Sequence, residues 1–180
     1  METTAQGVRV RRVDALDERE IRGLAEVLVD CVEGGASVSF MQPMSRDKAE
    51  AFWREMGAGA ARGERIVLVA EDASGTIIGT VQVILRQPEN QPHRGDLAKM
   101  LVHRRARRRG VGEALLGEAE ALARKAGKTL LVLDTASDSA ERLYERGGWK
   151  RVGVIPDYAL SPEGALLPTT YYYKVLAGAG

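Results

Sequence analysis

The sequence contains few of the residues that build metal or disulfide scaffolds. It has one cysteine, Cys31, and two histidines among 180 residues. A single cysteine cannot form an internal disulfide, and two histidines provide no Cys/His cluster at zinc-ligand spacing. We therefore expect neither a disulfide framework nor a metal site in this chain.

Long apolar runs and a strong net charge are also missing. No run approaches the roughly 18 apolar residues that a membrane span requires, and the opening METTAQGVRVRR lacks the charged-then-apolar order of a secretory signal. The 26 Lys and Arg residues balance 25 Asp and Glu residues, so the formal net charge is only +1. Such a chain lacks the field of a non-specific nucleic-acid binder. These absences predict a cytoplasmic protein with neither a membrane nor a nucleic-acid partner.

The overall composition is that of a folded globular protein. Hydrophobic residues make up 44% of the chain and charged residues 28%. No excess of Pro, Gln or Ser indicates disorder, and no internal repeat is visible. At about 100 to 200 residues per domain, the chain is expected to form one domain over residues 1–180.

Strand-like and helix-like periodicities alternate along the chain and predict a mixed α/β sheet. Two β-branched runs joined through residues 72–75 have hairpin composition, and a strand, helix and strand over 97–134 imply a parallel crossover. The expected strands are 7–13, 65–71, 76–85, 97–103, 129–134, 149–155 and 169–176, and the expected helices are 17–31, about 45–61, 111–126 and 139–147.

The densest chemical signal is the segment Leu101–Ala114, LVHRRARRRGVGEA, in which an expected strand is followed by five arginines, two glycines and an amphipathic helix. Gly110 and Gly112 carry no Cβ, so a phosphate can approach the free N–H groups of the first helical turn. The helix dipole favours an anion there, and flanking arginines add charge-assisted contacts. The segment therefore predicts a phosphate-binding loop.

Other interpretations of the arginine run stay open at this stage. It can be a solvated helix entrance, or a nucleic-acid or localisation patch, because Lys/Arg-rich runs are common. It is not a Walker A loop, since no Gly-Lys-Ser/Thr follows, and its glycine spacing differs from that of a dinucleotide fingerprint.

The pattern Arg107-x-x-Gly110-x-Gly112, with a strand before it and a helix after it, resembles the acyl-CoA signature of the GNAT superfamily of acetyltransferases. The resemblance implies a single-domain α/β fold: a mixed, mostly antiparallel sheet with a central parallel strand pair splayed around acetyl-CoA. It implies that the loop holds the CoA pyrophosphate and that the preceding strand pairs with the pantetheine arm. The residues implied to bind acetyl-CoA are Met100, Leu101, Val102, Arg107, Arg108, Arg109, Gly110, Val111, Gly112, Glu113 and Ala114.

A narrower resemblance lies mainly in the second half of the chain. The segments at 91–102, 131–135, 140–144 and 151–176 are similar to the tabtoxin-resistance type of GNAT acetyltransferase. That similarity implies N-acetylation of a small-molecule amine, such as a β-lactam or amino-acid-like toxin, and a role in antibiotic or toxin resistance. The chain departs from that type at Asp96, where the resistance protein has glutamate, and at His93, where it has asparagine.

Two carboxylates are candidates for removing a proton from the acceptor amine. An alkylammonium with a pKa near 10 is almost wholly protonated at neutral pH, so acetyl transfer needs a base or a water relay. Asp96 precedes the strand expected to pair with pantetheine, and Asp134 ends the next parallel strand, where ligand crevices open. Alternatively, Asp96 is a plain surface residue and Asp134 caps a turn in DTASDS.

A phenol is the best candidate for protonating the departing CoA thiolate. Tyr144 lies on the short helix where the GNAT resemblance implies a tyrosine near the thioester sulfur, although the same helical stripe is also typical of a core aromatic. Backbone N–H groups of the strand at 97–103 would stabilise the oxyanion if that strand bulges as in its relatives.

Other notable side chains have mainly structural interpretations. Cys31 is expected in the core, and His103 is expected to be solvated or close to the phosphates. Aromatic and Met side chains that could line an acceptor pocket, but that more often pack, are Phe40, Met41, Trp53 and Tyr158.

The leading hypothesis is an acetyl-CoA-dependent N-acetyltransferase for a small-molecule amine, acting as a monomer or homodimer without a metal. A non-catalytic acyl-CoA-binding sensor is the alternative, because it would need the phosphate loop but neither a base nor Tyr144.

Overall fold

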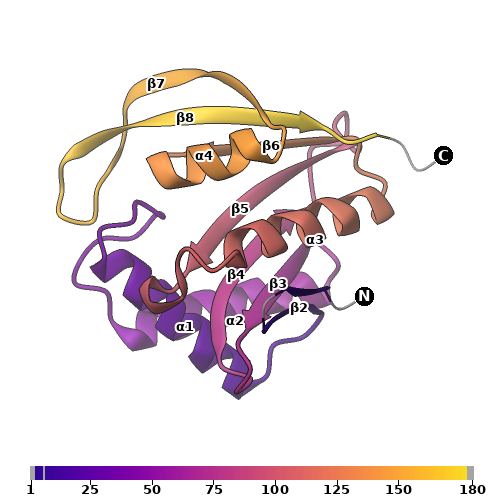
Figure 1. The fold of residues 1–180 in the computed structure, drawn as a ribbon. Helices are drawn as coiled ribbons and strands as arrows, with labels where there is room; N and C mark the ends of the chain where they lie inside the picture. The colour runs from indigo at the N-terminus through magenta and orange to yellow at the C-terminus, as the bar shows by residue number, and fades with distance from the viewer. Residues whose placement is uncertain (1–2, 6, 178–180) are drawn as a thin grey trace.

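A twisted eight-stranded sheet forms the centre of the computed structural model, which describes residues 3–5 and 7–177 (Figure 1). Its strand order is β1-β2-β3-β4-β5-β6-β8-β7, and all neighbours are antiparallel except β5 and β6. The strands are β1 (Thr3–Ala5), β2 (Val8–Val13), β3 (Arg65–Glu71), β4 (Ile77–Ile84), β5 (Arg94–Val102), β6 (Leu130–Thr135), β7 (Lys150–Leu160) and β8 (Leu166–Val175).

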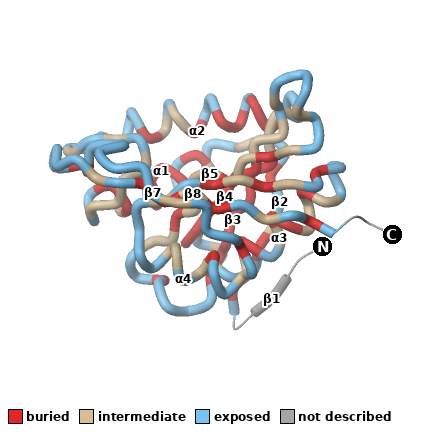
Figure 2. The backbone as a smooth tube through the Cα atoms, turned by 90° about the horizontal axis from the view of Figure 1, so that it is seen from above, coloured by how far each residue is buried: buried red, intermediate tan, exposed pale blue. Residues whose placement is uncertain are grey.

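The helices cover the two faces of this sheet in pairs, and the buried residues lie between them and the strands (Figure 2). One face carries α1 (Glu18–Glu33) and α2 (Arg46–Ala61), and the other carries α3 (Val111–Lys125) and α4 (Asp138–Arg146). Side chains alternate between faces along a strand. Accordingly, Val67 and Val69 of β3 enter the core under α1 and α2, while Leu68 enters the core under α3.

The structure confirms the expected fold class, including the parallel crossover β5–α3–β6. The expected helix from the Ser45 cap ends at Ala61 as predicted, and the hairpin of β3 and β4 is antiparallel. The helix expected over 111–126 ends one residue early, at Lys125. Ala126 follows the helix and is exposed, so it does not face the core.

Sequence periodicity missed β1, ended β7 too early at residue 155 and started β8 too late at residue 169. Strand β7 runs to Leu160, and β8 begins at Leu166. Almost every residue of β7 is exposed, so this strand has no alternation of buried and exposed positions for a pattern to detect.

The hairpin of β7 and β8 projects past α4 toward the loop between α1 and α2 (Figure 1). At its tip, Gln42 of that loop donates from its backbone N–H to Pro162 O at 3.0 Å, and Ser37 Oγ donates to Leu160 O at 3.1 Å. The hairpin also bends, since its register shifts between Ile155 and Ala159 and Asp157 has a left-handed φ of 50°. Its exposed large hydrophobic side chains are Val152, Val154, Ile155, Tyr158, Leu160, Leu166, Tyr173 and Val175.

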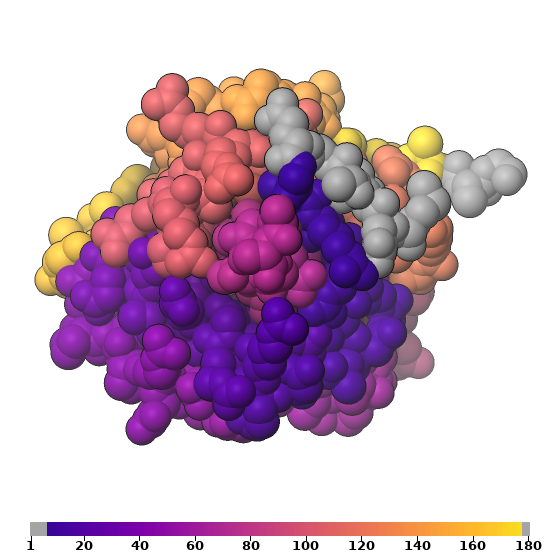
Figure 3. All heavy atoms as spheres, turned by 60° about the horizontal axis from the view of Figure 1, so that its bottom comes forward, coloured from indigo at the N-terminus to yellow at the C-terminus, as the bar shows by residue number. Residues whose placement is uncertain are grey.

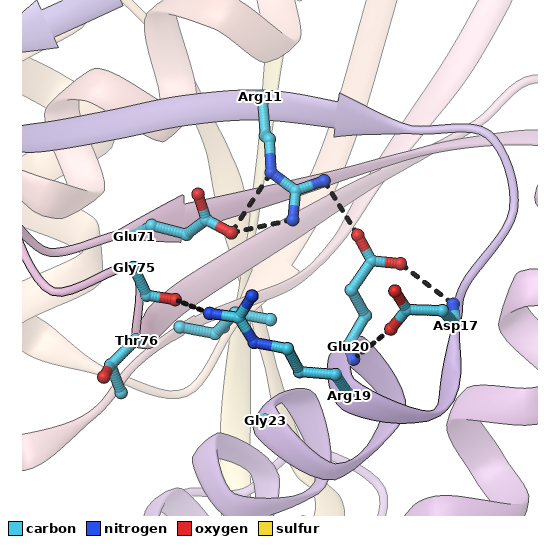
Figure 4. A pocket seen from close by; sticks show the side chains of 9 residues that line it. Arg11, Asp17, Arg19, Glu20, Gly23, Glu71, Gly75 and Thr76 are labelled. Atoms are coloured by element: carbon cyan, nitrogen blue, oxygen red, sulfur yellow. Dashed lines mark hydrogen bonds and ion pairs between the residues drawn. The ribbon is translucent and has the colours of Figure 1, made fainter.

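A shallow polar hollow at the start of α1 is closed by its own ion pairs (Figure 4). Arg11 of β2 donates to Glu71 of β3 at 2.7 Å and lies 2.8 Å from Glu20 of α1. Glu20 and Asp17 form a capping box, so the hollow's carboxylates already have donors. This cluster ties α1 to the sheet, and its charges satisfy one another.

Glu120 is the buried acid that joins α3 to the end of the chain. Its side chain is 9% exposed, and it accepts from Trp149 Nε1 at 2.9 Å and from Lys174 Nζ at 2.6 Å. The contacts connect α3, the start of β7 and β8, so they hold the parallel pair against the C-terminal hairpin.

We expect Glu120→Ala to lower the free energy of unfolding by about 2 to 3 kcal/mol, because the Trp149 indole N–H loses its acceptor and the Lys174 ammonium keeps only Gly147 O. Denaturant titration of this variant beside Glu55→Ala measures the effect. Glu55 is an exposed α2 residue, whose loss should stay within about 0.5 kcal/mol. Equal midpoints for both variants would show that the Glu120 contacts are not stabilising.

Candidate active site

The parallel strands β5 and β6 separate part-way along their length. They pair only from Arg94↔Leu130 to Asp96↔Val132. Beyond that register, no strand among the described residues pairs with the edge of β5 that faces β6, from Leu97 to Val102. An opening with free backbone groups on its edge can pair with an extended, amide-bearing ligand.

A β-bulge lies on β5 at this opening. Gln82 of β4 pairs with Ala98 and Thr80 pairs with Leu101, so Lys99 and Met100 together oppose one residue of β4. Lys99 has a left-handed φ of 53°. The structure thus contains the bulge that sequence alone could not establish, and its backbone N–H groups turn out of the regular ladder.

The N-terminus of α3 is the only one of the four described α-helices without a side-chain cap. Asp17, Ser45 and Ser137 cap α1, α2 and α4, whereas α3 begins after Gly110, which has a φ of 76°. A Cβ at Gly110 would contact nothing within 4 Å, so the first turn is open to a ligand. Because a helix start carries free N–H donors and a positive dipole end, this turn favours an anion.

The five arginines before this turn divide into two groups. Arg104 and Arg105 bind the carboxylates of α1, with Arg104 Nε 2.9 Å from Asp30 and Arg105 Nη1 3.3 Å from Glu26. In the part of the chain that the structure describes, Arg107, Arg108 and Arg109 form no ion pair. The segment around residues 100–112 lies at the surface between α1 and α4 (Figure 3), so these cations are accessible. This separation favours an anion site beside Gly110 over a uniformly solvated run.

The two candidate bases have different surroundings. Both Asp96 oxygens are engaged, one by the Arg94 guanidinium and the other by Gln87 Nε2 at 3.0 Å. Asp134 is exposed at the end of β6 and accepts one hydrogen bond, from Thr169 Oγ1 at 2.7 Å. Among the described residues, Asp134 has no cation within ion-pair distance, so its other oxygen is available to a ligand.

The charge of Asp134 also acts on the pKa values of three side chains around the opening. Together with burial, its charge raises the pKa of Tyr144. The hydrogen bond to Tyr158, then burial and the charge of Asp134, raise the pKa of Tyr171 to about 12. Asp134 also opposes the lowering of the Lys99 pKa that burial causes. Asp134 therefore lies within electrostatic range of α4, β8 and the bulge.

Tyr144 packs in the core, as one of its two interpretations predicted. Its side chain is buried in the core and packs against Trp149 and Tyr172, with ring centroids 5.7 and 6.1 Å away. Its hydroxyl has no hydrogen-bond partner in the described residues, and its raised pKa keeps the proton on the phenol at neutral pH. The packing holds the ring in place and leaves the O–H available as a donor.

The remaining predicted residues divide between core and surface. Cys31 is buried as predicted, and its Sγ donates to Val102 O at 3.5 Å. Trp53 of α2 is fully buried, so it packs in the core and lines no surface pocket. His103 lies 3.6 Å from Asp30 and accepts from Arg105 N–H. Tyr158 is exposed and hydrogen-bonds the Tyr171 hydroxyl at 2.9 Å.

Sequence reasoning missed Lys99, Tyr171 and the Gln87–Arg94 pair. Lys99 is inconspicuous in DLAKMLV, because its role depends on a bulge that no local pattern specifies. The position of Tyr171 beside the opening follows only from its pairing with Asp134 on the neighbouring strand. Paired residues on neighbouring strands share a face, so strand pairing was the missing signal.

Comparisons with known proteins agree with this geometry. A family model described as "Acetyltransferase (GNAT) family" matches residues 23–149. The chain belongs to this family. An uncharacterized N-acetyltransferase from the hisH–hisA intergenic region of Azospirillum brasilense is 30% identical over 129 residues, which cover 71% of this chain and 74% of that protein. The chain is therefore an acyltransferase of the N-acetyltransferase class.

Solved structures show the same fold with different acceptors. A phosphinothricin acetyltransferase from Sinorhizobium meliloti, in complex with acetyl-CoA, has a TM-score of 0.79 at 18% identity, covering 97% of this chain and 91% of its own. A ribosomal-protein-alanine N-acetyltransferase from Brucella melitensis has a TM-score of 0.74 at 23% identity, covering 93% and 99%. The fold alone therefore does not choose between small-molecule and protein acceptors.

The described residues contain no helix that is both long and apolar enough to cross a membrane. They also contain no group of three or more His, Cys, Asp or Glu side chains positioned to hold a metal ion.

Proposed function

We propose that the protein transfers the acetyl group of acetyl-CoA to the amine of a small molecule. The observation that carries this proposal is that the uncapped start of α3 and the opening between β5 and β6 lie at the same end of the parallel pair. An anion site and an unpaired strand edge at one end match a ligand that has phosphates at one end and amides along its arm.

The proposed coenzyme contacts follow from this placement. The N–H groups of Val111 to Ala114, with Gly110, would hold the pyrophosphate, and Arg107, Arg108 and Arg109 would neutralise its charge. The backbone of Met100, Leu101 and Val102 would pair with the pantetheine arm. Bound acetyl-CoA would supply the acetyl group as a thioester.

We propose Asp134 as the group that accepts the amine proton. It has one carboxylate oxygen without a partner among the described residues, whereas Arg94 and Gln87 occupy both oxygens of Asp96. A carboxylate that is already neutralised is a weaker base. Asp96 would then keep the start of the opening in place through its contacts with Arg94 and Gln87.

The bulge and Tyr144 would stabilise the two negative charges that develop in the reaction, on the carbonyl oxygen and on the departing sulfur. Backbone N–H groups turned out of the ladder at Lys99 and Met100 can stabilise an oxyanion. The free hydroxyl of Tyr144 can donate a hydrogen bond to a departing thiolate. A non-catalytic sensor would need neither feature.

The acceptor is proposed to be small, and detoxification of an amino-acid-like toxin is the role that the tabtoxin-type resemblance suggests. The tip of the β7–β8 hairpin bonds the α1–α2 loop at Gln42 and Ser37, so these two segments are joined. If the acceptor enters past this junction, the junction favours a small molecule over a protein chain. The cytoplasmic location remains a prediction.

The coenzyme site is tested by Gly110→Asp. We expect acetyl-CoA affinity, measured by calorimetry, to fall about 10- to 100-fold, because a carboxylate would meet the pyrophosphate. Gly127→Asp is the matched control, since Gly127 also has a positive φ, of 81°, and nothing within 4 Å. Both variants share the backbone strain of a left-handed residue. Unchanged affinity in folded Gly110→Asp would exclude this loop as the phosphate site.

The base is tested by Asp134→Asn and Asp96→Asn. If Asp134 accepts the proton, its asparagine variant should lose about 10²- to 10⁴-fold in kcat/KM. Asp96→Asn should lose much less, because Arg94 and Gln87 already occupy its oxygens. A large loss confined to Asp96→Asn would assign the proton to Asp96, and two unchanged rates would remove both carboxylates from proton transfer.

Tyr144→Phe should lower kcat about 10- to 100-fold while acetyl-CoA affinity stays within about twofold, because the donor acts only as negative charge develops on sulfur. The ring contacts are retained, so the melting temperature should not change. Tyr173→Phe, an exposed hydroxyl on β8, is the control. A wild-type kcat with chemistry rate-limiting would identify Tyr144 as a packing residue.

A further inference from the structure

Lys99 has an unusual position for a lysine. It occupies the β5 bulge with a left-handed φ of 53°, and its Nζ lies 3.1 Å from Ser39 Oγ and 5.9 Å from the centre of the Phe52 ring. Ser39 also has a left-handed φ, of 77°. Two strained non-glycine residues in contact are costly and cluster at functional sites. The strain and the hydrogen bond that holds the ammonium therefore indicate a functional position for Lys99.

The Lys99 ammonium is not neutralised by the protein. In the described residues, Ser39 is its one hydrogen-bond partner, and no carboxylate lies within ion-pair distance of Nζ. Burial lowers the pKa of Lys99, and the neighbouring Arg65 acts in the same direction. A partly buried ammonium has three donors, so two remain for a ligand. Burying an unpaired ammonium costs free energy, and the binding of an anion offsets that cost.

Register places Lys99 across the opening from Asp134. The last pair of β5 and β6 is Asp96↔Val132, so two residues further along each strand lie Ala98, next to Lys99, and Asp134. The charge of Asp134 acts on the Lys99 pKa, which agrees with this placement. One side of the opening thus presents a free cation, and the other presents a free carboxylate.

Resting on the proposed function, we infer that Lys99 binds a carboxylate of the acceptor, whose amine is directed toward Asp134. The acceptor class is then amines that carry a carboxylate, as amino acids do. Lys99 is the residue that selects this class, because it is the cation at the bulge beside the proposed oxyanion site.

A monoanion fits this site better than a phosphate. A doubly charged phosphate would require a second cation, and Arg65, whose charge acts on the Lys99 pKa, already donates through Nη1 to Gln82 Oε1 at 2.7 Å. Asp134 opposite would repel the second charge. The rings of Phe52 and Phe40, 5.1 Å apart, add apolar surface beside the ammonium that suits a small organic acid.

The test compares each amino acid of a panel with its amide and its decarboxylated amine, using acetyl-CoA and thiol detection. The wild-type enzyme should prefer the carboxylate form. Lys99→Met keeps the backbone N–H of the bulge and removes the ammonium, so it should lower kcat/KM for that form about 10- to 100-fold more than for the amide and the amine, since only the carboxylate form loses a charge-assisted contact. Lys99→Arg keeps a cation and should retain part of the preference.

The control is Lys48→Met, which removes an exposed cation 5.7 Å from the Phe40 ring. It should leave the preference unchanged, and an equal loss in both variants would assign the effect to the general field instead of Lys99. If the wild type acetylates amides and amines as well as it acetylates acids, or if Lys99→Met weakens all forms alike, the inference is wrong while the proposed function stands. If no acceptor of the panel causes thiol release, both the inference and the proposed function are rejected.

Discussion

The separation of β5 and β6 is the constraint on which the rest of the structure depends. Parallel strands require a crossover, and here the crossover helix α3 starts at the end where the strands part. A single chain path therefore brings a helix N-terminus, an unpaired strand edge and the end of β6 to one place. The contacts of buried Glu120 on α3 hold this arrangement, because they fasten α3 to β8.

Charges are distributed around the opening so that the groups serving structure and those available to ligands are distinct. Asp96 is occupied by Arg94, and Arg104 is occupied by Asp30, so these pairs fix the surrounding loops. Asp134 and the arginines beside Gly110 keep no such partner among the described residues. A protein stabilises its fold by pairing charges, so unpaired ones at a single opening indicate where ligands complete the pairing.

Sequence reasoning predicted the elements that have a period and missed those that depend on pairing. The helix expected over 17–31 forms as α1, and one of its faces is buried through Ile21, Leu24, Ala25 and Leu28, because helical spacing and burial coincide. Gly110 predicted an open helix start, since that is a local backbone property, whereas a Cβ at Gly112 would lie 3.1 Å from Leu143 Cδ2, so this glycine makes room for α4. Lys99 and Tyr171 were not predictable, because a bulge and a strand register are set by residues far away in the chain. The difference in environment between Asp96 and Asp134 also came only from contacts, above all with Arg94 and Thr169.

The bend in β7 also affects how the molecules behave toward one another. A long edge strand with apolar side chains is a template on which strands of other chains can add, and this leads to aggregation. Pro156 has no N–H, and Asp157 turns out of the extended conformation, so the edge is interrupted between Ile155 and Ala159. Lys150 and Arg151 place positive charge at the beginning of the strand. The hairpin can therefore expose aromatic and aliphatic side chains near the opening while its edge discourages the growth of an intermolecular sheet.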